Sequence, residues 1–256
     1  FLMSKTISGF SLILGVLVII IANLLIPGNS AGITGGDAIS VSAMTENAGF
    51  DKGTTQTFII ILGFGILIFL NGFLGIYRGI GDRETEFKGL AMALTVIAIA
   101  LFMGTLALGN AFASSAESNI TASQGAQMAA QAAGGGDPAA IAQANAAAGS
   151  ALVAGSASAG IYGAYWGLFA MASYIFLLAT IFTGWIIVKS GDHYLNRMLN
   201  MVVGYGLMIS GIVFLILNLI WPVNEVAGYQ IFGISQLIWG ILIIILGAGI
   251  LTSKAK

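Results

Sequence analysis

Side chains able to act as acids, bases or metal ligands are confined to short segments between long apolar runs. The single histidine, His193, lies in the sequence Gly191-Asp192-His193-Tyr194, where an acid stands beside an imidazole. Neighbours in a short polar segment usually face solvent, and a metal site requires further ligands. There is no cysteine, so the chain offers no thiolate nucleophile or ligand. We therefore expect no catalytic, cofactor-binding or metal-binding residue, no cofactor and no enzymatic activity.

Charged residues gather in one further segment, residues 78–88, in which the two signs nearly balance. Its members are Arg78, Asp82, Arg83, Glu84, Glu86 and Lys88. Gly79 and Gly81 lack the strand and the Lys-Ser/Thr pair of a phosphate-binding loop. We interpret the segment as a hydrated turn that pairs with lipid headgroups or a neighbouring chain. The sequence predicts no nucleotide or nucleic-acid partner.

The polar side chains that lie inside the apolar runs are uncharged. They are Asn23, Asn71, Thr95, Thr105, Ser173, Thr180, Thr183, Ser210, Asn218 and Gln236. Hydrogen bonds between helices are their default role in a membrane. Asn23 and Asn218 each stand four residues before a proline, so their amides are placed to satisfy backbone groups that proline frees. Alternatively, Asn23, Asn71 and Asn218 line the mouth of a pore for a neutral solute.

The composition predicts which solvent surrounds the elements that hold these residues. Apolar residues form 58% of the 256-residue chain and charged residues only 7%, against about a quarter charged in soluble domains. A lipid bilayer is therefore the expected surroundings. Unpaired backbone groups cost several kcal/mol in hydrocarbon, and the apolar runs are continuous rather than alternating, which favours helices over barrel strands.

Six apolar runs reach the roughly 20 residues that a helix needs to cross a bilayer. They cover residues 8–27, 57–77, 89–113, 162–188, 197–222 and 231–252. They contain no Asp, Glu, Lys or Arg apart from a boundary residue such as Arg197, which argues against an ion-driven pump. The predicted fold class is all-α, a polytopic transmembrane helix bundle of about six spans.

The basic residues predict the orientation, because short loops rich in Lys and Arg stay in the cytoplasm. One side of the predicted membrane carries Lys5, Arg78, Arg83, Lys88, Lys189, Arg197, Lys254 and Lys256. Only Lys52 lies opposite, among the acidic residues Asp37, Glu46 and Asp51. We expect both termini to be cytoplasmic, in a multi-pass protein of a prokaryotic cell (plasma) membrane.

Residues 114–161 form an Ala-, Gly- and Ser-rich interruption, which the charges place outside. It is either a disordered loop or a pair of Ala-rich helical segments broken at Gly134-Gly135-Gly136. We favour a helix over 137–150, with Asp137 as its N-cap and Pro138 as its first residue.

Small residues recur from this interruption into the fourth apolar run. The glycines are Gly149, Gly155, Gly160, Gly163 and Gly167. Such smooth surfaces let transmembrane helices approach closely. They are a candidate docking face for another subunit, or else ordinary packing within this bundle.

The first and fifth runs resemble each other when residue 8 is set against residue 203. The shared ending Asn-Leu-x-x-Pro-x-Asn occupies 23–29 in one and 218–224 in the other. Arg78-Gly-Ile-Gly81-Asp82 also echoes Lys189-Ser-Gly191-Asp192. These matches indicate a duplicated helical hairpin whose two copies run in the same direction. Many transporters instead contain inverted repeats, so this pattern does not favour a transporter.

Two functions remain open on the sequence alone. The first is a non-catalytic structural or assembly subunit of a larger integral membrane complex, with membrane lipids and other membrane subunits, or further copies of itself, as partners. The second is a passive channel or facilitator for a small uncharged solute. A channel predicts a continuous polar track through Asn23, Asn71 and Asn218, whereas a scaffold predicts a dry centre packed with Gly and Ala.

Overall fold

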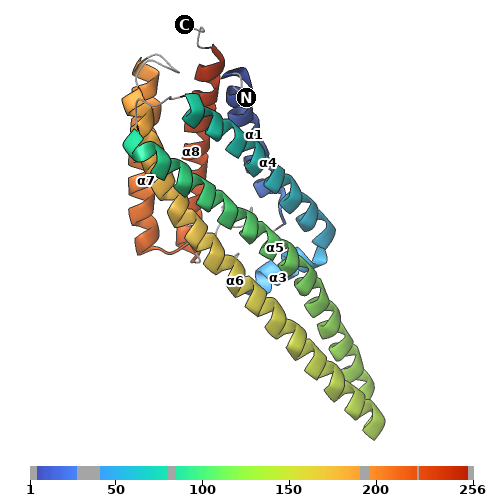
Figure 1. Ribbon diagram of the computed structural model, residues 1–256. Helices are drawn as coiled ribbons and strands as arrows, with labels where there is room; N and C mark the ends of the chain where they lie inside the picture. The colour runs from blue at the N-terminus through green and yellow to red at the C-terminus, as the bar shows by residue number, and fades with distance from the viewer. Residues whose placement is uncertain (1–4, 28–40, 80–84, 191–196, 224, 253–256) are drawn as a thin grey trace.

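A computed structural model of the chain describes residues 5–27, 41–79, 85–190, 197–223 and 225–252. His193 and residues 80–84 of the charged segment lie outside these ranges. The described residues form helices and no strand, which confirms the predicted all-α class (Figure 1). The helices are α1 (Lys5–Leu25), α3 (Val41–Phe50), α4 (Lys52–Gly79), α5 (Thr85–Ala133), α6 (Pro138–Ser190), α7 (Arg197–Ile220) and α8 (Val226–Thr252).

Six helices, all but α3, are long and apolar enough to cross a membrane. The chain is therefore a multi-pass membrane protein, as its composition predicts. The first turn of α1 and the last turn of α8 lie at one end of the bundle, here called the termini end (Figure 1). The opposite end, from which α5 and α6 extend beyond the other helices, is called the hairpin end.

Of the two alternatives for residues 114–161, the structure bears out the pair of helical segments broken at the glycine run. Helix α5 continues to Ala133 and α6 begins at Pro138, so the segment is a helical hairpin. With 49 and 53 residues, the helices are roughly 75–80 Å long at 1.5 Å per residue, against about 30 Å of hydrocarbon. Ala has the highest helix propensity, and α5 and α6 run side by side along their length (Figure 1), so each helix supports the other.

The turn of this hairpin has the predicted cap. Asp137 Oδ1 accepts a hydrogen bond of 3.0 Å from the backbone N–H of Ala139, and Pro138 is the first residue of α6. Gly136 has a φ of 78°, a backbone conformation that favours glycine. The glycine run and Asp137 therefore break the helix only briefly.

Backbones of the six long helices approach one another closely at the contacts of α1 with α4, α6 with α7, and α1 with α8. At each contact, a Cβ atom added to a glycine would overlap backbone of the facing helix. The glycines are Gly15 and Gly72 at the first contact, Gly184 and Gly204 at the second, and Gly9 and Gly247 at the third. Small residues thus set the spacing of the bundle, as is typical in membranes.

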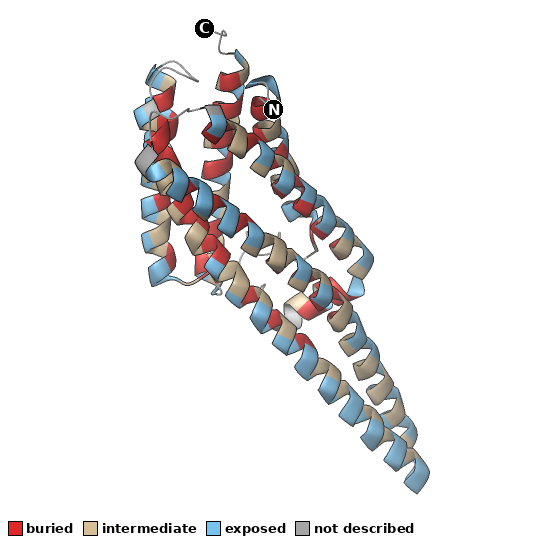
Figure 2. Ribbon diagram, in the orientation of Figure 1, coloured by how far each residue is buried: buried red, intermediate tan, exposed pale blue. Residues whose placement is uncertain are grey.

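The buried residues lie where these helices meet (Figure 2), and the outward faces carry many large apolar side chains. Leu12, Leu207 and Ile243 are fully buried at 0% exposure. Tyr77 of α4 and Thr183 of α6 join their hydroxyls at 2.8 Å inside the bundle. Large apolar side chains remain exposed on the outside, among them Phe10, Ile209 and Leu219, as expected of a surface that faces lipid.

Helix α3 is a feature that the sequence did not predict. It is only ten residues long and packs against α5, where Ala48 of α3 is buried with Ala113 and Ala116. Gly49 allows this close contact, since an added Cβ would lie 2.9 Å from the carbonyl carbon of Ala116. The helix therefore extends the packed core at the hairpin end.

Candidate functional site

The span hydroxyls singled out in the sequence bond to backbone of their own helices, and that of Thr183 also meets Tyr77 of α4, a bond between helices as expected. Each donates to a backbone carbonyl three or four residues earlier. The cases are Thr95, Thr105, Ser173, Thr180, Thr183 and Ser210. In hydrocarbon the nearest acceptor is the preceding turn of the same helix. These residues therefore supply no polar track.

The three asparagines occupy different surroundings. Asn71 on α4 donates through Nδ2 to Ser11 Oγ on α1 at 3.3 Å. Asn218 on α7 is fully buried, and neither atom of its amide has a partner among the described residues. Asn23 lines a cavity that Asn71 and Asn218 do not line. Among the described residues, these three side chains therefore do not form a continuous polar track.

Pro222 frees the backbone carbonyl of Asn218, since a proline nitrogen carries no hydrogen. The hydroxyl of Tyr174 on α6 donates to this carbonyl at 2.9 Å. The expectation that the Asn218 amide satisfies the freed group is therefore wrong, because that amide has no partner among the described residues. A tyrosine on the neighbouring helix does so instead, which no spacing rule in the sequence reveals.

Replacing Tyr174 with Phe should destabilise the α6–α7 contact. The carbonyl of Asn218 then loses its donor, at a cost of about 1–3 kcal/mol for a buried unsatisfied group. Thermal unfolding in mild detergent measures the loss. Tyr205→Phe on α7 is the matched control, since Tyr205 is 45% exposed, and it should change stability little. Equal stability of both variants would contradict this role of Tyr174.

The glycines of α6 predicted as a docking face fall into two groups. A Cβ added at Gly149, Gly160, Gly163 or Gly167 would meet nothing within 4 Å. Gly155 instead faces Asn119 of α5, whose Oδ1 would lie 3.4 Å from such a Cβ. Packing within this chain therefore explains Gly155 but leaves the other four facing open space.

One exposed stripe runs along α6 with a spacing of three or four residues. We call it the α6 stripe, and its members are Gly149, Val153, Ser156, Gly160, Gly163, Gly167 and Met171. Val153 is 70% exposed, and the end of α6 that leads from the hairpin turn extends past the bundle (Figure 2). The stripe thus continues from the projecting hairpin into the apolar span.

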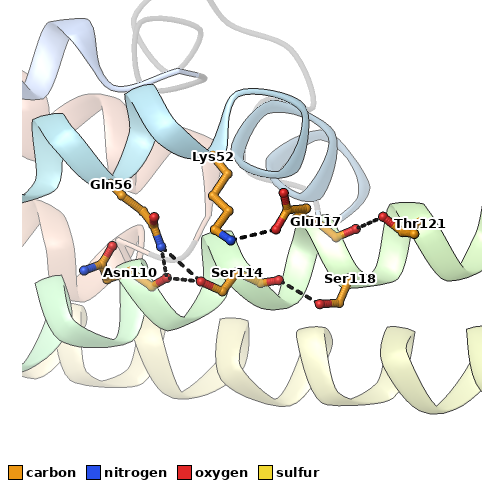
Figure 3. A network of polar contacts seen from close by, with 7 residues as sticks. All are labelled: Lys52, Gln56, Asn110, Ser114, Glu117, Ser118 and Thr121. Carbon is orange, nitrogen blue, oxygen red and sulfur yellow. Dashed lines mark hydrogen bonds and ion pairs between the residues drawn. The ribbon is translucent and has the colours of Figure 1, made fainter.

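A polar network ties α4 to α5 at the hairpin end (Figure 3). Lys52 Nζ and Glu117 Oε2 form an ion pair of 2.7 Å. One turn along, Gln56 Nε2 donates to Ser114 Oγ at 3.0 Å. Lys52, the one basic residue on its side of the predicted topology, is thus neutralised by a partner 65 residues further along the chain.

No family model, curated protein or solved structure matches the chain. Its function is therefore inferred from its own sequence and structure. Among the described residues, no group of three or more His, Cys, Asp and Glu side chains is placed to hold a metal ion. Among the described residues, the α6 stripe and a cavity inside the bundle both offer room for a partner.

The bundle interior holds a cavity of about 600 Å³, bounded by α1, α3, α4, α5, α6 and α8. This interior therefore differs from both expectations, since it is neither a continuous polar track, as a channel predicts, nor a centre packed with Gly and Ala, as a scaffold predicts. Aliphatic and aromatic side chains form most of its lining, and the aromatic ones are Phe69, Phe102, Phe112, Tyr162, Tyr165, Phe169, Phe176, Tyr229, Phe232 and Trp239. Trp239 contacts Phe69 and Phe176 with ring centroids 4.9 Å apart in both cases.

Proposed function

We propose that this protein is a non-catalytic structural or assembly subunit of a larger integral membrane complex. The observation that carries the proposal is the α6 stripe, where four glycines face open space within this chain. Glycines exposed in the middle of a helix cost about 1 kcal/mol each relative to Ala. A partner helix that packs closely against them offsets this cost.

The projecting hairpin supports the same function. Leu152 and Val153, neighbours on α6, are 73% and 70% exposed. Both precede the predicted span at 162–188, in the half of α6 that follows the hairpin turn, and α5 and α6 extend past the other helices at that end (Figure 1). Exposed apolar side chains in that position favour burial against another protein.

The proposed orientation places the termini end in the cytoplasm of a cell membrane. Lys5, Arg78 and Arg197 belong to that end, where basic residues are retained. The Lys52–Glu117 ion pair supports this orientation, since it neutralises the opposing basic residue. The hairpin then projects to the exterior.

A passive channel for an uncharged solute receives less support. The cavity lining is mainly apolar and aromatic, whereas a conducting path needs groups that replace the solute's hydration. Asn71 and Asn218 do not line this cavity. The geometry therefore favours the assembly subunit.

Purification from native membranes in mild detergent, followed by native mass measurement, tests the proposal. We expect the chain to elute with at least one further polypeptide, and the measured mass distinguishes a different subunit from a second copy. A monodisperse single chain in every mild detergent would contradict the proposal. A single chain that also conducts a neutral solute in liposomes would establish the channel instead.

A further inference from the structure

The cavity inside the bundle is amphipathic along its length. Its polar lining residues lie on the hairpin-end side of the rings around Trp239: Asn23, Thr55, Thr105, Tyr162, Tyr165, Tyr229, Gln230 and Gln236. Deeper in the bundle the lining is apolar, with Val16, Ile66 and Phe102, and the rings around Trp239. A molecule that fits would have a polar head at the hairpin end and a hydrocarbon body toward the middle of the bundle.

The lining is also uncharged. None of the described residues around the cavity is Asp, Glu, Lys, Arg or His. A charged head buried here would have no counter-charge, and burying an unpaired charge is costly. The head of the occupant must therefore be neutral.

Two lining residues have hydrogen-bonding atoms without partners among the described residues, Thr55 Oγ1 and Gln236 Nε2. Thr55 is only 3% exposed, and Gln236 lies one helical turn from Trp239. The amide nitrogen of Gln236 can only donate, so it requires an acceptor oxygen. Buried polar groups normally have partners, and an oxygen-bearing head would supply one.

We propose that this cavity binds a neutral lipid, with an uncharged head bearing carbonyl or hydroxyl oxygens and a long hydrocarbon chain. The hydrocarbon lies among Val16, Ile66, Phe102 and Trp239, and the head lies toward Thr55 and Gln236. A volume of about 600 Å³ falls within the roughly 300–1,000 Å³ of small-molecule sites. The surrounding bilayer supplies such molecules directly.

Gly233 offers a way to fill the cavity without disturbing the fold. It lines the cavity, and a Cβ added there would meet nothing within 4 Å. The side chain of Gly233→Leu therefore occupies the space of the ligand, whereas Gly233→Ala adds only one methyl group. Gly89→Leu is a second control, since Gly89 on α5 also faces open space and does not line the cavity.

The test measures quenching of tryptophan fluorescence by brominated lipids in phosphatidylcholine vesicles. Brominated diacylglycerol is the uncharged probe, and brominated phosphatidylcholine is the zwitterionic comparison, whose phosphate and ammonium groups would find no charged partner in the lining. Trp239 lines the cavity, and Trp239→Phe identifies its share of the signal. For the wild-type chain, we expect half-maximal quenching of Trp239 at an at least about tenfold lower mole fraction of diacylglycerol than of phosphatidylcholine.

The variants decide whether this preference comes from the cavity. Gly233→Leu should abolish it, whereas Gly233→Ala and Gly89→Leu should retain it. Gln236→Leu should reduce it about tenfold, and this variant decides the outcome if Gly233→Leu does not elute as a monodisperse protein. Equal quenching of the wild-type chain by both lipids, or an undiminished preference in Gln236→Leu, would overturn the proposal.

Discussion

Gly15→Ala should be among the most destabilising single-methyl changes in this protein. The added Cβ would lie 2.5 Å from the backbone nitrogen and 2.6 Å from the Cα of Phe69 on α4. Backbone cannot move aside as a side chain can, so α1 and α4 must separate along their contact. Overpacking of this kind costs about 1–3 kcal/mol, and sometimes more.

Thermal unfolding of the purified chain in detergent measures this effect. At roughly 2–4 °C per kcal/mol for a chain of this size, we expect the midpoint to fall by several degrees. Gly89→Ala is the control, because its Cβ meets nothing within 4 Å and Ala is the better helix former. An unchanged or raised midpoint for Gly15→Ala would show that α1 and α4 are not packed as described.

Replacing both Gly163 and Gly167 with Leu should disrupt the proposed assembly while leaving the chain folded. Both positions face open space in this chain, so two leucine side chains meet no internal obstacle. On a surface where a partner's backbone approaches closely, they would hold the two proteins apart. We expect at least about a tenfold loss of co-purifying partner, which corresponds to roughly 1.4 kcal/mol.

Co-purification from native membranes, normalised to the amount of folded chain, measures that loss. Gly89→Leu is the matched control, since it makes the same substitution at an open helix position off the α6 stripe. It should retain the partner fully. Full retention of the partner by the double variant would place the interface elsewhere on the molecule.

The sequence predicted those parts of the fold that depend on local chemistry. The six apolar runs all correspond to helices, because continuous hydrophobicity leaves few other structures in lipid. The start of α6 at Asp137 and Pro138 was also predicted, since capping depends on neighbouring residues. The extent of α5 and α6 was underestimated, because their mutual support comes from contacts between distant residues.

Features that join distant segments could not be predicted in this way. The ion pair of Lys52 with Glu117 and the bond from Tyr174 to the Asn218 carbonyl both cross between helices. The cavity likewise depends on how six helices are placed. The many small residues predicted that helices would pack closely. They did not predict which glycines would face another helix and which would face open space.

Photo-crosslinking in native membranes tests the assembly function most directly. A photoreactive amino acid at Gly160, on the α6 stripe, should give a light-dependent adduct to one discrete polypeptide. The same amino acid at Ile209, a residue of α7 that is 60% exposed, should give lipid adducts alone. Absence of a protein adduct from Gly160, or the same adduct from both positions, would contradict the assignment of the α6 stripe as a docking face.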